Sequence, residues 1–127
     1  MKKIFTEKAP NPAGHYSQAI VYGNTVYVSG QLPIDPETGG KRIGSIEEQT
    51  EQVLKNLSEI LKASKSGIDK LVKTTVYISD IGLWSRVDAA YSRFLGDHRP
   101  ARVVVPTRDL HFGFQIEIEA IAAVDET

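Results

Sequence analysis

The strand-like segment at residues 116–122 constrains the fold most. Isoleucines alternate with Glu117 and Glu119, and the residues that follow, 120–122, are small or apolar. A period of two is typical of a β-strand. Residues 100–105 enter a run of valines through proline and alanine, and they predict another strand. Residues 106–115 join the two. One arginine, Arg102, therefore lies at the start of a strand, and two carboxylates share one face of the next.

The first half of the chain predicts a hairpin. Residues 19–22 and 25–28 are rich in β-forming residues and flank Gly23-Asn24. A two-residue Gly-X connection of this kind favours a type II′ turn. Before it, an extended arm with a short strand near residues 3–5 is expected. After it, residues 29–40 are expected to form a polar loop, because they are rich in proline and glycine.

Two amphipathic helices are expected. Ser45 and Glu48 match the Ser-x-x-Glu pattern of a capping box, so one helix begins there. Asp80 is placed to cap a second helix, which Gly96 ends. Apolar residues recur at helical spacing and are expected in the core: Val53, Leu54, Leu57, Ile60 and Leu61 in the first helix, and Leu83, Trp84, Val87, Ala90, Tyr91, Phe94 and Leu95 in the second.

A further strand at residues 72–78 lies between the helices. Its alternation predicts one side formed by Val72, Thr74, Val76 and Ile78. The order hairpin, helix, strand, helix, strand, strand predicts one α+β domain over residues 1–127, with both helices on one face of a mixed sheet.

The other face of this sheet is expected to be apolar. The residues predicted to lie there are Val21, Tyr27, Tyr77, Ile121 and some of the valines at 103–105. Because monomers rarely expose such a patch, a homo-oligomer is predicted.

Composition narrows the function classes. The net charge is −1, so no global field attracts nucleic acid or anionic lipid, and without cysteine the chain has no disulfide, thiolate nucleophile or iron–sulfur site. The three histidines, His15, His98 and His111, lack the spacing of metal ligands, so no metal is expected. His111 follows the strand of Arg102 and could enter a pocket, but a structural or solvent role is expected for it. The chain shows no apolar leader or membrane-length run, and a cytoplasmic protein is expected.

Five strings of residues resemble one known family. They are residues 15–19, 28–33, 73–77, 100–102 and 116–122, and together they extend over nearly the whole chain. In order and spacing they resemble the Rid family, also called YjgF or L-PSP. The resemblance implies a chorismate-mutase-like fold, a homotrimer with clefts between subunits, and hydrolysis of reactive 2-imino or 2-amino acids to 2-oxo acids and ammonia without a cofactor.

The resemblance also implies a set of site residues. Arg102 matches the arginine that holds the substrate carboxylate, and Glu117 matches the glutamate that positions the attacking water. Tyr16 and Ser29 match pocket residues, and Gly30 falls where the backbone approaches the ligand. The chemistry suits these residue types, because a guanidinium fork pairs with a carboxylate and a protonated imine needs only oriented water and a base.

The chain also departs from the family pattern. Val104 replaces a frequent cysteine, Asp88 replaces a frequent asparagine, and the loop at residues 106–114 lacks the usual Leu-Pro. These differences concern substrate preference. Without the resemblance, Arg102 and Glu117 would be interpreted as surface charges or an ion pair; Glu119 is assigned a structural role.

Two other functions stay open. One is a non-catalytic protein that binds or senses a 2-oxo acid through Arg102. The other, endoribonuclease, follows the family's older name, and the net charge and the lack of a histidine pair disfavour it.

Overall fold

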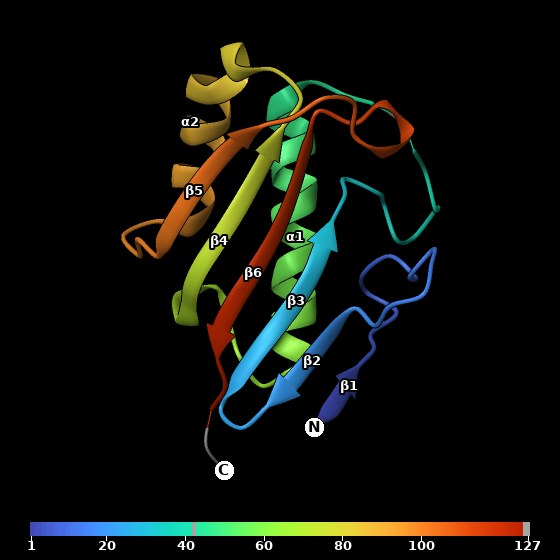
Figure 1. Ribbon diagram of the computed structural model, residues 1–127, viewed down its shortest axis with the longest axis vertical. Coiled ribbons are helices and arrows are strands. Elements are labelled where there is room, and N and C mark those ends of the chain that lie inside the picture. The colour runs from blue at the N-terminus through green and yellow to red at the C-terminus, as the bar shows by residue number, and fades with distance from the viewer. Residues whose placement is uncertain (42, 126–127) are drawn as a thin grey trace.

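Six strands form one mixed sheet, and both helices cover the same face of it (Figure 1). The computed structural model describes residues 1–41 and 43–125. The strands are β1 (Lys2–Ile4), β2 (Ala19–Tyr22), β3 (Thr25–Gln31), β4 (Leu71–Ile78), β5 (Ala101–Pro106) and β6 (Ile116–Ala123), and the helices are α1 (Ile46–Ala63) and α2 (Trp84–Leu95). The sheet order is β1-β2-β3-β6-β4-β5, in which only β4 and β5 pair in parallel. The predicted α+β class is confirmed.

The predicted hairpin is present, but its second strand is longer than expected. Gly23 has a φ of 64°, the positive value that the first position of a type II′ turn requires. Strand β3 continues to Gln31, with a register shift against β6 between Val28 and Gln31. The prediction that Ser29 and Gly30 begin a loop was wrong, because this bulge lets the strand continue while changing the direction of its side chains.

The capping box at the start of α1 is confirmed. The Glu48 backbone N–H donates to Ser45 Oγ at 3.1 Å, and the Ser45 backbone N–H donates to Glu48 Oε1 at 3.2 Å. Each bond satisfies a donor that the first helical turn would otherwise leave to solvent.

We expect Ser45→Ala to lower the free energy of unfolding by about 1 kcal/mol, the usual effect of losing an N-cap hydroxyl. Urea denaturation followed by circular dichroism measures this difference. Ser45→Thr keeps the hydroxyl and serves as the control. Equal stability of the alanine variant and the wild type would show that the cap contributes nothing here.

The core lies between the sheet and the two helices. The predicted stripe of α1 is completely buried, and from β6 the side chains of Ile116, Ile118, Ala120 and Ala122 point into the same core. In β4 the residues Thr74, Val76 and Ile78 share one side, as predicted, and that side is buried, whereas Val72 is 53% exposed. A register shift between Leu71 and Lys73 causes this difference: Leu71 takes the buried position instead.

Three other sequence expectations were wrong in detail. Asp80 caps a 3₁₀ turn, Ile81–Leu83, by accepting from the Gly82 N–H, and α2 begins only after this turn. Trp84, the first residue of α2, is 41% exposed and outside the core. Val21 lies opposite the buried Val26 and packs against the core, so it faces the helices and not the open side.

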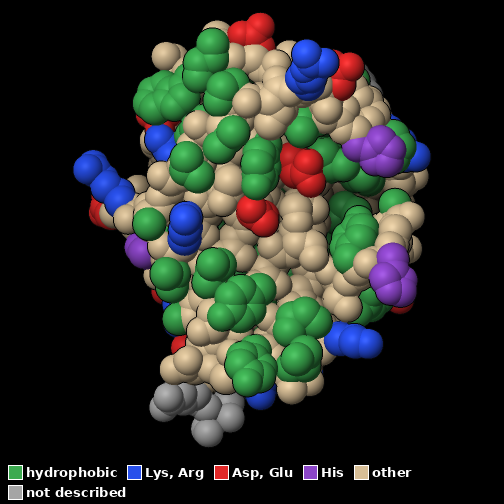
Figure 2. Space-filling view, in the orientation of Figure 1, with side chains coloured by type: hydrophobic (Ala, Val, Ile, Leu, Met, Phe, Trp, Pro, Cys, Tyr) green, Lys and Arg blue, Asp and Glu red, His purple; other side chains and the backbone are tan. Residues whose placement is uncertain are grey.

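The face of the sheet without helices carries apolar side chains, as predicted (Figure 2). Tyr22 is 63% exposed and Tyr27 is 47% exposed, and Val103 is exposed as well. Ile121 lies opposite Tyr27 and is half-buried. Acidic side chains lie near the middle of the same view. Nothing within the described chain covers this face.

Neither α1 nor α2 combines the length and the apolar character that a membrane-spanning helix needs, and the described residues contain no other helix that does.

Candidate active site

Arg102 lies on the helix-covered side of the sheet, beside α2. Its position on β5 pairs with the buried Thr74, so its side chain points towards α2, where Nη1 donates to Asp88 Oδ1 at 2.9 Å. The guanidinium carbon lies 4.9 Å from the centre of the Tyr91 ring. A stacked and ion-paired guanidinium is held in one orientation.

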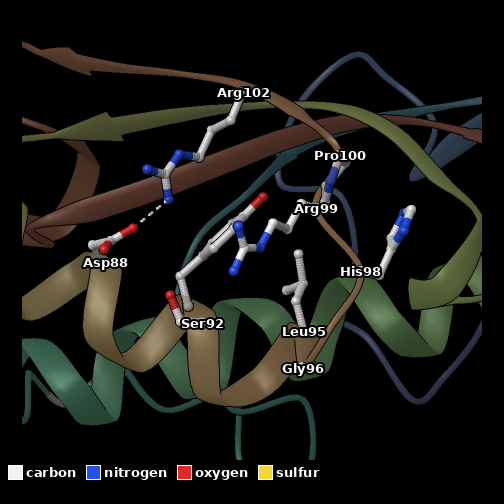
Figure 3. Close-up of a pocket in the computed structure, with 9 residues that line it drawn as sticks. Asp88, Ser92, Leu95, Gly96, His98, Arg99, Pro100 and Arg102 are labelled. Carbon is white, nitrogen blue, oxygen red and sulfur yellow. Dashed lines mark hydrogen bonds and ion pairs between the residues drawn. The ribbon is translucent and has the colours of Figure 1, made fainter.

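A cavity of about 540 Å³ opens next to this arginine. Figure 3 shows it between α2 and the start of β5, with Arg102 extending over it from the strand, Arg99 from the connection before the strand, and Asp88 and Ser92 from the helix. A guanidinium has five N–H donors, so a single bond to Asp88 leaves donors for an incoming carboxylate. The same bond offsets part of the positive charge that would attract such a ligand.

Glu117 lies on the opposite face of the sheet. It pairs with Tyr77 on β4, and its neighbours Ile116 and Ile118 point into the core. A Cβ atom added at Gly30 would overlap Glu117 Oε2, so the carboxylate lies directly against the β3 bulge. Only glycine leaves room for it there. Burial, and secondarily the charge of Glu119, raise the pKa of Glu117, while His111 acts in the opposite sense.

The β3 bulge also fixes the arm that carries Tyr16. Ser29 Oγ donates to the Ser17 carbonyl at 2.7 Å, and the Ser29 backbone N–H donates to the Gln18 carbonyl at 2.9 Å. The buried Gln18 amide in turn donates to the Thr6 and Pro10 carbonyls, both at 3.0 Å. The hydroxyl of Ser29 therefore holds the arm in place, and Ser29 lines neither the cavity beside Arg102 nor the one beside Tyr16.

Tyr16 and Gly30 meet at a small cavity of about 50 Å³. His111 and Phe112, from the loop between β5 and β6, close its other side. The predicted residues thus fall into two groups: Tyr16 and Gly30 line one cavity, with Glu117 against Gly30, whereas Arg102 lines a separate cavity on the other face.

Three features of these sites depend on contacts between segments that are distant in sequence. The Asp88–Arg102 pair joins a helix to a strand, and no local spacing of residues predicts it. The alternation of β5 and β6 places Arg102 and Glu117 on opposite faces, which becomes readable only once the strand register is known. Gln18 lies within one of the family-like strings, but its hydrogen bonds to the Thr6 and Pro10 carbonyls are seen only in the structure.

Other candidate groups have structural partners. Glu119 accepts from the Tyr77 hydroxyl at 2.9 Å, which agrees with its assigned structural role, and the His98 ring lies 2.8 Å from the Leu71 carbonyl oxygen. Among the residues that the structure describes, no three histidine, aspartate or glutamate side chains converge in a way that suits a metal ion.

Comparison with known proteins identifies the family. The family model described as Endoribonuclease L-PSP matches residues 6–124. A RutC family protein of Pyrococcus abyssi is 47% identical over 119 residues, covering 94% of both chains. The rat protein named 2-iminobutanoate/2-iminopropanoate deaminase is 44% identical over 121 residues, which covers 95% of this chain and 88% of its own.

A solved structure agrees with these sequence matches. The crystal structure of the YjgF gene product from E. coli superposes with a TM-score of 0.92 at 37% identity, covering 97% of this chain and 98% of that one. From its sequence and its fold, the chain belongs to the L-PSP family, which includes the YjgF and Rid proteins.

Proposed function

We propose that this protein hydrolyses reactive 2-imino acids and their enamine tautomers to 2-oxo acids and ammonia. The observation that supports this most is the half-buried Glu117 carboxylate, which lies against the bare backbone of Gly30 and has a raised pKa. A carboxylate in this state is a stronger base than one in water. The name of the rat relative points to the same reaction class.

The reaction needs one group to hold the acid and another to activate water. Arg102 binds the substrate carboxylate through two N–H donors, which fixes the position of the imine carbon. Glu117 accepts a proton as water adds to that carbon, and its negative charge favours the cationic iminium. Collapse of the carbinolamine breaks the C–N bond and releases ammonia.

We further propose that each site is formed by two chains of a homotrimer. Arg102 and Glu117 lie on opposite faces of one sheet, so one chain cannot present both to a small ligand. β5, which carries Arg102, is an edge strand, and the open face beside Glu117 carries exposed tyrosines. Covering that face with the β5 edge of a neighbour would bury the tyrosines and bring the arginine to the glutamate.

Two measurements test this proposal. A pyridoxal-dependent dehydratase supplied with serine or threonine generates 2-imino acids, and added protein is expected to speed the appearance of the 2-oxo acid. Light scattering at micromolar concentration is expected to give three times the chain mass. No acceleration with a panel of imino acids would contradict the reaction, and a monomer would contradict the shared site.

A non-catalytic protein that binds 2-oxo acids is the second candidate. The Asp88–Arg102 bond favours it, because an arginine that already has a carboxylate partner is suited to reversible exchange of one anion for another. Calorimetric binding of 2-oxobutyrate without faster imine hydrolysis would support this alternative. RNA cleavage, which the family description mentions, is disfavoured by the acidic groups on the open face (Figure 2).

Gly30→Ala is expected to reduce imine hydrolysis at least about tenfold, because the new Cβ would push the Glu117 carboxylate from its place. The coupled assay measures the rate. Gly67→Ala is the matched control: its Cβ would meet only the movable Asp69 carboxylate, so its rate should equal that of the wild type. Full activity of Gly30→Ala would show that the position of Glu117 is not critical.

A further inference from the structure

His111 faces the cavity that contains the predicted pocket residues. It begins the short 3₁₀ turn His111–Gly113 that leads into β6, and it lines the cavity together with Tyr16 and Gly30. Gly30 is also the residue against which the Glu117 carboxylate rests. The ring thus lines this cavity, which is the alternative that the sequence left open for His111.

The imidazole ring is held by its neighbours. It stacks on Phe112 with 3.7 Å between ring centres and 15° between ring planes. Phe112 has a φ of 62°, a left-handed conformation that is costly for a side chain of this size. Lys41 Nζ lies 4.1 Å from the centre of the Phe112 ring, and Phe114 contacts that ring edge-on. A strained backbone that persists beside a cavity is characteristic of a functional position.

Charged side chains from two other segments lie near His111 and Phe112. On β6, Glu117 is the acidic group that interacts with His111, and on the connection from β3 to α1 the ammonium of Lys41 lies over the Phe112 ring. The positive charge of His111 lowers the pKa of Glu117 against the effects of burial and of Glu119. His111 lines the cavity beside Gly30, and the Glu117 carboxylate rests against Gly30, so the histidine and the glutamate have a common neighbour.

We propose that His111 is the acid that protonates the departing nitrogen in this protein. The inference rests on the deaminase function proposed above. Water adds to the iminium carbon and gives a proton to Glu117, which leaves a neutral carbinolamine. The His111 imidazolium then protonates the amino nitrogen. The C–N bond breaks, its electron pair leaves with ammonia, and the hydroxyl becomes a carbonyl as its proton returns to His111. Ammonia takes the proton from Glu117 and departs as ammonium.

Histidine suits this step because its charge changes near neutral pH, so it can donate and recover a proton within one turnover. Arginine and lysine do not release protons so readily. The residue that the site needs as an acid is therefore supplied by the loop at 106–114, where the chain departs from the family pattern.

The kinetics of His111→Phe test the assignment. The substitution keeps a ring to stack on Phe112 and removes both nitrogens. We expect kcat to fall about 10²-fold with KM within about threefold of the wild type, because Arg102 still holds the carboxylate. The wild-type kcat should decline as pH rises, because a general acid must be protonated to act. That decline should be absent in His111→Phe, while the acid-side decline remains.

The control and the outcomes separate this inference from the proposed function. His15→Gln removes another exposed histidine, and it should behave like the wild type. An unchanged alkaline decline in His111→Phe, or a kcat within twofold of the wild type, would overturn the role of His111 and leave the deaminase function intact. A wild-type protein that hydrolyses no imine would overturn both.

A second readout does not depend on turnover. Carboxyl ¹³C NMR titration is expected to give a higher pKa for Glu117 in His111→Phe than in the wild type, because the neighbouring positive charge has been removed. The same Glu117 pKa in the two proteins would contradict the proximity on which the proton transfer depends.

Discussion

Replacing Glu117 with glutamine is expected to lower the rate of imine hydrolysis about 10²–10⁴-fold, the usual effect of removing a positioned general base. Glutamine has nearly the same shape, so the contact with Gly30 is kept while the proton acceptor is lost. The wild-type rate should fall on acidification as Glu117 becomes protonated, and its raised pKa places that fall above the range of an ordinary glutamate. The coupled assay over a pH series measures both effects.

The same substitution has an expected effect on stability. Because the pKa of Glu117 is higher in the folded chain than its ordinary value of 4.5, the protonated form is favoured by folding. The wild type therefore loses stability as pH rises through the folded-state pKa, and the glutamine variant does not. Thermal unfolding should show Glu117→Gln to be the more stable protein at neutral pH, with the difference vanishing below about pH 4.

Glu119→Gln is the matched control for both measurements. It removes a neighbouring negative charge that raises the pKa of Glu117, so its rate should remain high and its acid-side decline should move to lower pH. Glu117→Gln with full activity would exclude Glu117 as the base. A larger loss in Glu119→Gln than in Glu117→Gln would exchange the roles of the two residues.

Replacing Arg102 with alanine is expected to weaken binding of a 2-oxo acid such as 2-oxobutyrate about 10²-fold or more. Each charge-assisted hydrogen bond contributes about 1.5–3 kcal/mol, and a carboxylate on a guanidinium fork makes two. Because Asp88 already accepts a hydrogen bond from this guanidinium, the loss of affinity is expected near the lower end of that range. Calorimetry measures the dissociation constant, and kcat/KM for imine hydrolysis should fall by a similar factor.

Two variants make this result specific. Arg102→Lys keeps the charge without the planar fork and should lie between alanine and the wild type. Arg93→Gln removes an arginine of α2 that lies outside the Arg102 cavity, and it should change neither quantity. Because alanine leaves Asp88 without its partner, circular dichroism should first show that the variant is folded. Unchanged ligand binding by a folded Arg102→Ala would remove the arginine from the site.

The sequence was informative wherever a signal was local. The Ser45–Glu48 capping box, the Gly23 turn and the helical stripe of α1 each depend on residues a few positions apart, and each is found where the pattern predicts it. The fold class followed from the order of these elements. The candidate residues followed from motifs that resemble a family, and the family itself is confirmed by the comparisons.

The sequence alone determined which elements form and which residue types can carry the chemistry, because secondary structure and motif chemistry depend on near neighbours. Only the tertiary structure decided which side chains meet. An irregular pairing of β4 with β6 placed Val72 outside the core. A second irregular pairing, of β3 with β6, placed Gly30 against Glu117. The strand register put Arg102 and Glu117 on opposite faces of the sheet. Register is fixed by packing between distant segments, and one added residue in a strand reverses the face of every side chain beyond it.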